Sequence, residues 1–377
     1  MKPLHGPDFS SYAADEVTWL LTDLSDVDLE APVEQREAAI QAGTAHYAES
    51  LPIEYQPSEE YQRLFAAALD ASVGRVAYAV GVVTELVLST RARPVFVSLA
   101  RAGTPIGILM RRWAAAAHSL DVPHYTASIV RGRGIDRVAL RYLAGEHDPA
   151  GVVFVDGWTG KGAIARELRA TLDGSRFDPT LAVLADPGSC VPLYGTRDDY
   201  LIPSACLNST VSGLVSRTVL NDRLIGPDQF HGAKFYRQLA DRDVSNLFLD
   251  RIAAGFDAVR ARVAADWPVL AAADRTPDWR GWRMADDISQ RYGIGNVNLV
   301  KPGVGETTRV LLRRVPWRVL VRPGAEAELA HVLLLAEQRG VAVEEVPDLP
   351  YSCVGLIHPR YTAGATGADG RRVEVDA

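Results

Sequence analysis

An acidic residue followed by a turn of small residues and a lysine is the stretch of this chain best suited to chemistry. Asp156 follows the apolar run at 152–155, and Lys161 lies in the glycine-rich turn at 157–162. The apolar run is short and β-branched, which predicts a buried strand, and apolar residues at helical spacing over 164–172 predict a helix after the turn. Backbone N–H groups at the start of such a helix point at one spot, and glycines let an anion approach them closely. We therefore expect this turn to bind a phosphate and Asp156 to accept hydrogen bonds from ribose hydroxyls.

Two common phosphate-binding loops do not match this turn. A Walker A loop has four residues between its first glycine and its Gly-Lys pair, followed by Ser or Thr. Here Gly157 and Gly160 are only three apart, and Gly162 follows Lys161. The G-x-G-x-x-G fingerprint of dinucleotide-binding folds does not follow the strand either. The open interpretations are another kind of phosphate loop and an ordinary strand-to-helix turn of an α/β sheet.

Two further strand ends carry arginines. The apolar run at 95–99 predicts a strand that leads to Arg101, and a Thr-Pro pair then begins a helix. The strand expected at 124–130 leads into a glycine-rich turn with Arg131 and Arg133. A guanidinium can neutralise the charge of a leaving diphosphate, and a glycine-rich turn is expected to be mobile. Taken singly, each arginine also fits a solvated surface position.

In their order along the chain, these three turns resemble the diphosphate turn, the closing loop and the phosphoribosyl-diphosphate (PRPP) loop of type I phosphoribosyltransferases. The resemblance implies an α/β fold with a parallel sheet and helices on both faces. It also implies a catalytic site with Asp156 on the ribose, the mobile Arg131 and Arg133 on the diphosphate, and Mg²⁺ held by diphosphate oxygens and water. The substrate-binding residues that it implies are Ala100, Arg101, Ala102, Gly103, Gly157, Trp158, Thr159, Gly160, Lys161, Gly162, Ala163 and Asn208. The chain departs from that family where Gly157 replaces the second acidic residue and where the turn is shorter.

The composition argues against several classes of protein. A net charge of −7 argues against a surface that coats nucleic acid. The three cysteines, Cys190, Cys206 and Cys353, are odd in number and widely spaced, which argues for a reducing compartment and against a disulfide framework. The sequence has no C-x-x-C or H-E-x-x-H motif of a zinc site, and no apolar run reaches membrane-spanning length. We expect a cytoplasmic protein without membrane contact.

Patterns along the chain predict five segments. They are a helical extension at 1–57, a phosphoribosyltransferase-like domain at 58–270, a basic linker at 271–315, a small α/β domain at 316–362 and a disordered tail at 363–377. Within the small domain, VRPGAEAELAHVLLLAEQRGVAVEEVP resembles the Pelota/L7Ae-like RNA-binding module. Eight basic residues against three acidic ones over 283–322 make this stretch, with the C-terminal domain, the expected RNA contact. A structural or partner-binding role for the small domain is the open alternative.

Three segments, SIVRGRGID, VVFVDGWTGKG and LNSTVSGLVSRTV, are similar to the bacterial family found with tellurium-resistance and stress gene clusters. That family joins a phosphoribosyltransferase-like domain to a Pelota-type domain. The resemblance implies an enzyme that uses PRPP and Mg²⁺ to form an N- or C-ribosyl bond on a base-like acceptor, in the synthesis of a nucleoside-type metabolite for the stress response. The helical extension would then serve as a lid or as the arm of a homodimer.

Two alternatives to this transferase remain open. One is a non-catalytic sensor that binds PRPP or a nucleotide and reads RNA. The other follows from the cataloguing of the same family as StiP-type cysteine proteases. In that case a thiol, Cys190 or Cys206, would act with His231 and Asn208.

Overall fold

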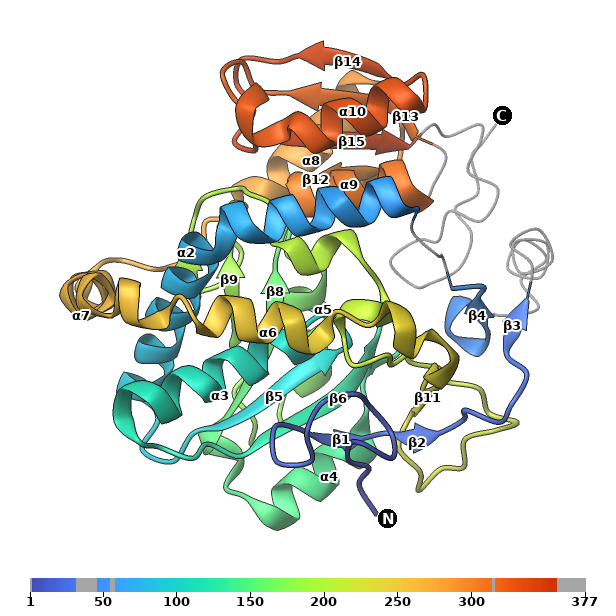
Figure 1. Cartoon of the computed structure of the whole chain (residues 1–377), viewed down its shortest axis with the longest axis vertical. Helices are drawn as coiled ribbons and strands as arrows, with labels where there is room; N and C mark the ends of the chain where they lie inside the picture. Colours follow the sequence, from blue (N-terminus) through green and yellow to red (C-terminus); the bar gives the residue numbers. More distant parts are fainter. Residues whose placement is uncertain (1, 32–45, 55–57, 314–315, 358–377) are drawn as a thin grey trace.

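A parallel sheet lies at the centre of the larger part of the molecule (Figure 1). The structure is a computed structural model that describes residues 2–31, 46–54, 58–313 and 316–357. The sheet has the order β1-β6-β5-β8-β9-β10, in which every neighbouring pair is parallel, and short β7 pairs antiparallel with β6. Its strands are β1 (Thr18–Leu20), β5 (Val95–Ala100), β6 (His124–Val130), β7 (Gly134–Ile135), β8 (Val152–Trp158), β9 (Leu181–Ala185) and β10 (Leu193–Thr196). The predicted α/β class with a parallel sheet is confirmed, whereas a specific phosphoribosyltransferase fold stays a prediction.

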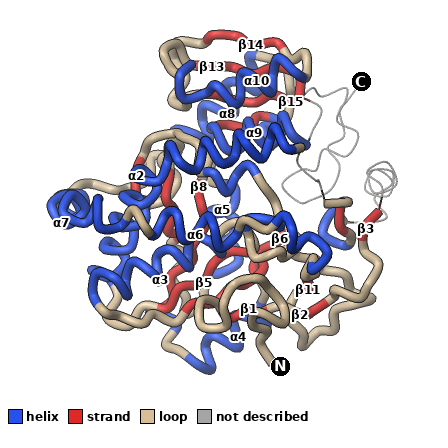
Figure 2. The backbone as a smooth tube through the Cα atoms, viewed as in Figure 1, coloured by secondary structure: helices blue, strands red, loops and turns tan. Residues whose placement is uncertain are grey.

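Helices cover both faces of this sheet (Figure 2). On one face lie α2 (Glu59–Thr90), α3 (Thr104–His118), α6 (Ser245–Ala253) and α7 (Phe256–Ala272), and on the other lie α4 (Arg137–Glu146) and α5 (Ala163–Leu172). Strand β8 shows the alternation: Val153 and Val155 belong to the core under α2 and α3, while Val152 and Phe154 belong to the core under α4 and α5. A parallel strand that is buried on both faces reads as an unbroken apolar run, which is why the sequence predicts it.

Helix α2 is the longest element of the described chain and runs through the core. By length and composition it could cross a membrane, with a mean hydropathy of 1.5 over its most apolar window, but 61% of that window is buried inside the protein. It packs against α3, α6 and α7, and a Cβ added at Gly81 would lie 2.7 Å from the Trp113 ring. The burial and this close helix contact identify α2 as a core helix.

The N-terminal segment corrects the expectation of a helical extension. Its described residues form β1, which is an edge strand of the main sheet, and the short strands β2 (Thr22–Asp23), β3 (Glu30–Ala31) and β4 (Leu51–Pro52). Trp19 and Leu20 are fully buried because both faces of β1 are covered. Residues 32–45 of the expected extension lie outside the described residues.

A second, four-stranded sheet with the order β12-β15-β13-β14 forms the C-terminal part of the molecule. Its elements are α8 (Arg280–Arg291), β12 (Val300–Pro302), α9 (Val304–Arg313), β13 (Pro316–Val321), α10 (Ala330–Gln338), β14 (Ala342–Glu345) and β15 (Cys353–Ile357). The predicted strands and helix after residue 316 are confirmed. The interpretation of residues 271–315 as a linker is wrong for much of this segment. Helix α8, strand β12 and helix α9 lie in it and pack into the C-terminal part. The tail expected at 363–377 lies outside the described residues.

The two parts are joined by buried polar contacts next to the glycine-rich turn. The Asp199 carboxylate accepts hydrogen bonds from the backbone N–H of Val304 (2.9 Å) and of Ser352 (2.8 Å). Burial raises the pKa of Asp199 to about 6 in spite of these donors. The Tyr351 hydroxyl donates to the Gly160 carbonyl oxygen at 2.5 Å. The C-terminal part thus contacts the glycine-rich turn directly, and this is the turn that the sequence predicts to bind a ligand.

Candidate active site

A pocket of about 220 Å³ lies at the carboxyl end of β8, between the two parts of the molecule. Nine of the residues predicted for the site line it: Ala102, Arg131, Asp156, Trp158, Thr159, Gly160, Lys161, Gly162 and Ala163. The C-terminal part contributes Lys301, Pro302, Glu306 and Arg309. The carboxyl ends of parallel strands are where open α/β sheets bind ligands, so both the fold and the cavity identify the same place.

Asp156 lies near the end of β8 and lines this pocket. Its Oδ1 accepts a hydrogen bond from the Gly157 backbone N–H at 2.8 Å. Burial raises the pKa of Asp156 to about 6, although this hydrogen bond and the nearby Arg309 guanidinium act in the opposite direction. The group therefore changes charge close to neutral pH.

The C-terminal wall of the pocket is an ion pair that stacks on an aromatic ring. Arg309 Nη1 lies 3.3 Å from Glu306 Oε1, and the Arg309 guanidinium lies 4.5 Å from the centre of the Trp158 ring. Burial alone would raise the pKa of Glu306, but the cations Arg309, Lys301 and Arg131 hold that pKa below its usual value. Within the described part of the chain, Arg309 Nε is a buried donor without a hydrogen-bond partner. Buried donors are normally satisfied, so this atom is suited to meet a ligand.

Lys161 corrects one expectation about the turn. Its ammonium donates to the backbone carbonyl oxygens of Val297 and of Val300, the latter at 2.9 Å. Burial lowers the pKa of Lys161 well below its usual value, and the cations Lys301 and Arg131 add to this effect. The side chain forms part of the pocket wall, but its ammonium holds the C-terminal part in place and does not project towards a phosphate.

The charges of the pocket favour an anionic ligand. Four cationic side chains line it, namely Arg131, Lys161, Lys301 and Arg309. The two carboxylates that face them belong to Asp156 and Glu306. The backbone N–H groups of the glycine-rich turn and the N-terminal end of α5 add partial positive charge to that of the basic side chains.

Six predicted site residues do not line the pocket. Half-buried Arg101 donates to Asn208 Oδ1 (2.6 Å) and to the Val215 carbonyl oxygen (3.3 Å), and its Nη1 lies 3.9 Å from Glu54 Oε2. Arg101 and Asn208 therefore hold the interior together, which is a correction of their expected contact with substrate. The remaining four are also outside the lining: Ala100 in β5, Gly103 at the start of α3, buried Gly157 and exposed Arg133.

All three thiols are buried. Cys190, Cys206 and Cys353 expose 3% of their surface or less, and none forms a disulfide. Burial raises the pKa of the Cys190 and Cys353 thiols above their usual range. A thiolate, the reactive form, is therefore disfavoured at both residues in this conformation.

His231 and Asn208 each form a hydrogen bond to a residue other than a cysteine. The His231 ring lies 2.9 Å from the Ser128 hydroxyl, and its backbone N–H donates to Asp136. Asn208 accepts from Arg101. The expectation that these two side chains orient Cys190 or Cys206 stays a prediction.

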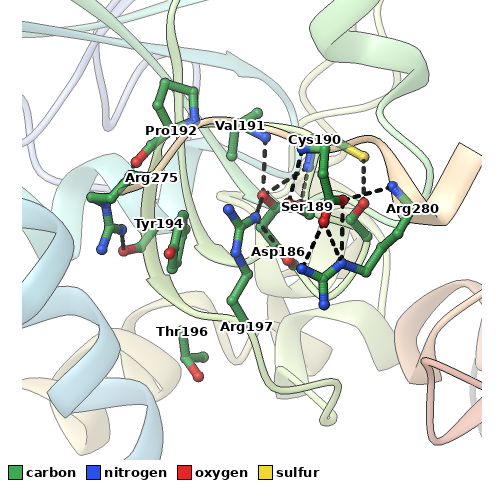
Figure 3. A network of polar contacts seen from close by, with 12 residues as sticks. Asp186, Ser189, Cys190, Val191, Pro192, Tyr194, Thr196, Arg197, Arg275 and Arg280 are labelled. Carbon is green, nitrogen blue, oxygen red and sulfur yellow. Dashed lines mark hydrogen bonds and ion pairs between the residues drawn. The ribbon is translucent and has the colours of Figure 1, made fainter. Parts of the chain in front are cut away.

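Figure 3 shows what surrounds Cys190 instead. The Asp186 carboxylate accepts hydrogen bonds from the backbone N–H of Cys190 (2.9 Å) and of Val191 (2.9 Å), and it pairs with Arg197. Burial raises the pKa of Asp186 to about 6 despite that pairing. The Cys190 thiol itself donates to the Gly188 carbonyl oxygen at 3.4 Å. The buried Asp186 carboxylate thus stabilises the turn that carries Cys190. No sequence motif predicts this role of Asp186.

Lys301, Glu306 and Arg309 are the charged pocket residues that the sequence did not assign to the site. The one signal that included them was the count of charges over 283–322, which is dominated by basic residues. That count reports a cationic surface and does not identify a pocket wall. Their position depends on α9 packing beside Trp158 and on β12 packing beside Gly160, and no local pattern encodes either contact.

Two family models match the chain. Residues 10–253 match the family described as "Tellurite-like stress resistance cysteine protease StiP", and residues 279–359 match the PELOTA RNA binding domain. A curated relative, "Cysteine protease StiP" of Acinetobacter baylyi, is 34% identical over 364 residues, which cover 92% of this chain and 93% of that protein. These findings support the tellurite and stress association, the Pelota domain and the cysteine protease alternative. They do not support the phosphoribosyltransferase assignment.

Proposed function

The chain belongs to the StiP family of tellurite-like stress resistance cysteine proteases, and on that premise we propose that it is a cysteine-dependent hydrolase whose reaction centre adjoins the pocket at the end of β8. The observation that carries the proposal is the similarity to the A. baylyi cysteine protease along nearly the whole length of both chains. Three cysteines without a disulfide fit a reducing compartment, so a cytoplasmic location is part of the proposal. The homodimer stays a prediction.

Cys190 is the nucleophile in this proposal because its thiol lies directly behind the pocket. A Cβ added at Gly162, which lines the pocket, would lie 2.9 Å from Cys190 Sγ. Cys353 lies in β15 of the C-terminal sheet, and Cys206 ends the 3-10 helix η3 (Pro203–Cys206). The Cys190 thiolate would attack a peptide carbonyl carbon, the amine would leave with a proton, and water would hydrolyse the acyl-enzyme.

The buried thiol sets a condition on this chemistry. Burial keeps the Cys190 thiol protonated, and the Asp186 charge nearby adds to that effect. The turn at 186–192 must therefore open before a thiolate forms, and a substrate that enters from the pocket would drive the opening. Reactivity of Cys190 towards an alkylating agent should rise when substrate is present.

The test is peptide hydrolysis by the full chain and by three alanine variants. Cys190→Ala should abolish hydrolysis, whereas Cys206→Ala and Cys353→Ala should retain it, and circular dichroism checks that each variant is folded. Alkylation with iodoacetamide, followed by mass spectrometry, identifies the reactive thiol independently. Full activity in folded Cys190→Ala would overturn the assignment of the nucleophile, and activity in all three variants would overturn the reaction class.

A second function is favoured by the charges in the pocket, namely binding of a small phosphorylated molecule of the ribosyl phosphate type. Four cations against two carboxylates, the glycine-rich turn and the buried Arg309 Nε support it. A transferase that uses PRPP and a sensor that only binds it are both forms of this proposal. Mg²⁺ would be held mainly by diphosphate oxygens and water, since the described residues contain no group of three or more metal-ligating side chains.

Calorimetry separates this second function from the first. PRPP with Mg²⁺ should bind wild type with a free energy of about −8 kcal/mol, which is micromolar affinity. Asp156→Asn should lose this binding because a ribose hydroxyl needs the carboxylate, whereas Cys190→Ala should keep it. No binding by wild type would remove this function and would leave the hydrolase proposal untouched.

A further inference from the structure

An open groove of about 820 Å³ lies on the surface where α5 meets α8, on the other side of the glycine-rich turn from the pocket. Its lining combines arginines and tryptophans with little else: Arg166, Arg169, Ala170, Asp173, Trp279 and Trp282. The Arg166 guanidinium lies 4.1 Å from the centre of the Trp282 ring, and that of Arg169 lies 5.8 Å from the centre of the Trp279 ring. Both tryptophans are half-buried, and both arginines are exposed.

The backbone holds Trp279 in an unusual conformation at the floor of this groove. Trp279 precedes α8 with φ 59° and ψ 28°, in the left-handed region that bulky residues rarely occupy. Its backbone N–H donates to the Ser189 carbonyl oxygen at 2.8 Å, which restrains the Trp279 backbone. A Cβ added at Gly162 would lie 2.5 Å from Trp279 Cζ3, so the groove floor contacts the back of the glycine-rich turn. A preformed aromatic floor loses little conformational entropy when a ligand stacks on it.

We propose that this groove binds single-stranded RNA, with unpaired bases stacked on Trp279 and Trp282 and backbone phosphates paired with Arg166 and Arg169. Single-stranded RNA is recognised through bases that stack on aromatic rings and on arginine planes, next to cations that neutralise phosphates. The groove supplies both groups, and its cations outnumber its one carboxylate, Asp173, on a chain whose net charge is −7. This inference goes beyond the proposed function and does not rest on it.

The match to an RNA-binding family supports RNA on this side. The region that matches the Pelota domain begins at Trp279 itself. On the edge strand β14 of that domain, Glu344 pairs with Arg318 and Glu345 adds a second carboxylate. The RNA surface thus combines α5 of the larger part with the first turn of α8, rather than the strands of the Pelota domain alone.

The experiment is fluorescence anisotropy of a labelled short oligouridylate with the full chain, titrated at several salt concentrations. Wild type should bind, and its affinity should fall as salt rises, because phosphate contacts release counterions. Trp282→Ala should lose about tenfold or more in affinity, since stacking of one base is worth ~1–3 kcal/mol, and Trp282→Phe should recover most of the loss. Arg166→Ala and Arg169→Ala should each weaken binding and reduce the salt slope by about one.

The matched control is Arg176→Ala, which removes an arginine whose exposed side chain lies 3.8 Å from Asp148, outside the groove lining. It should bind the oligonucleotide as wild type does. Equal affinity of wild type and Trp282→Ala would overturn the proposal, as would no binding by wild type. Binding of an acidic polypeptide in place of the oligonucleotide, with the same dependence on Trp282, would assign the groove to a protein partner and would also overturn it.

Discussion

At the scale of single residues, Asp156 gives the pocket a charge that changes near neutral pH. Burial raises the pKa of Asp156 to about 6, so its folded-state carboxyl is neutral below that pH and ionised above it. Glu306 stays ionised across this range because the pocket cations lower its pKa. Sulfate, whose charge is constant between about pH 5 and pH 8, should therefore bind more weakly as pH rises through about 6.

We expect a change of about fivefold, which corresponds to ~1 kcal/mol for one nearby charge. In Asp156→Asn the side chain is neutral at every pH, so sulfate affinity should be flat across this range and higher than that of wild type at about pH 7.5. Sulfate-induced shifts in melting temperature at two pH values are the measurement. An equal pH dependence in both proteins would show that another group titrates. PRPP should respond to Asp156→Asn in the opposite way, because its binding should need the carboxylate. Comparing sulfate with PRPP therefore distinguishes the binding of a simple anion from the binding of a ribosyl phosphate.

The Tyr351 hydroxyl is a single group that contacts both parts of the molecule. It is fully buried and donates to the Gly160 carbonyl oxygen at 2.5 Å. Tyr351→Phe should lower the free energy of unfolding by about 1 kcal/mol, because a buried acceptor loses its donor. Half-buried Tyr142 on α4 is the control, and Tyr142→Phe should change stability by less than about 0.5 kcal/mol. Urea denaturation measures both, and equal effects would mean that the contact at Gly160 contributes nothing.

At the scale of elements, α8 approaches the glycine-rich turn so closely that one of its positions has no room for a side chain. A Cβ added at Gly281 would lie 2.0 Å from Tyr351 Oη, 2.7 Å from Gly188 Cα and 2.8 Å from the Gly160 carbonyl oxygen. Gly281→Ala should therefore push α8 away from the turn and cost about 1–3 kcal/mol of stability.

The matched control is Gly74→Ala, in exposed helix surface where an added Cβ would meet nothing within 4 Å. That substitution should stabilise α2 by about 0.5–1 kcal/mol, since alanine is the better helix former. Denaturant midpoints for the two variants should move in opposite directions. A Gly281→Ala variant as stable as wild type would show that α8 is not held against the turn.

The same elements show what the sequence could predict. The strand, turn and helix around Asp156 were predicted correctly because a doubly buried strand reads as an unbroken apolar run. The N-terminal residues around Trp19 have spacing that also fits a helix, and only pairing with β6 makes them a strand. Arg101 has the right chemistry for a diphosphate, but its partners Asn208 and Glu54, distant in sequence, turn it inwards.

At the scale of the whole molecule, the pocket belongs to neither part alone. The larger part contributes Asp156 and the glycine-rich turn, and the C-terminal part contributes Lys301, Glu306 and Arg309. A ligand that touches both walls should slow amide hydrogen exchange at 156–163 and at 300–309 together. Hydrogen-exchange mass spectrometry with saturating pyrophosphate is the measurement, and protection confined to one of the two segments would mean that the ligand contacts a single wall.

The composite pocket also bears on how proteins of this architecture can diverge. Its lining is divided between the region that matches the StiP family and the region that matches the Pelota domain. A recombination that replaces the C-terminal module would therefore replace one wall of the pocket in the same step. The ligand preference then depends on both modules together. The two modules must therefore coevolve to keep that preference.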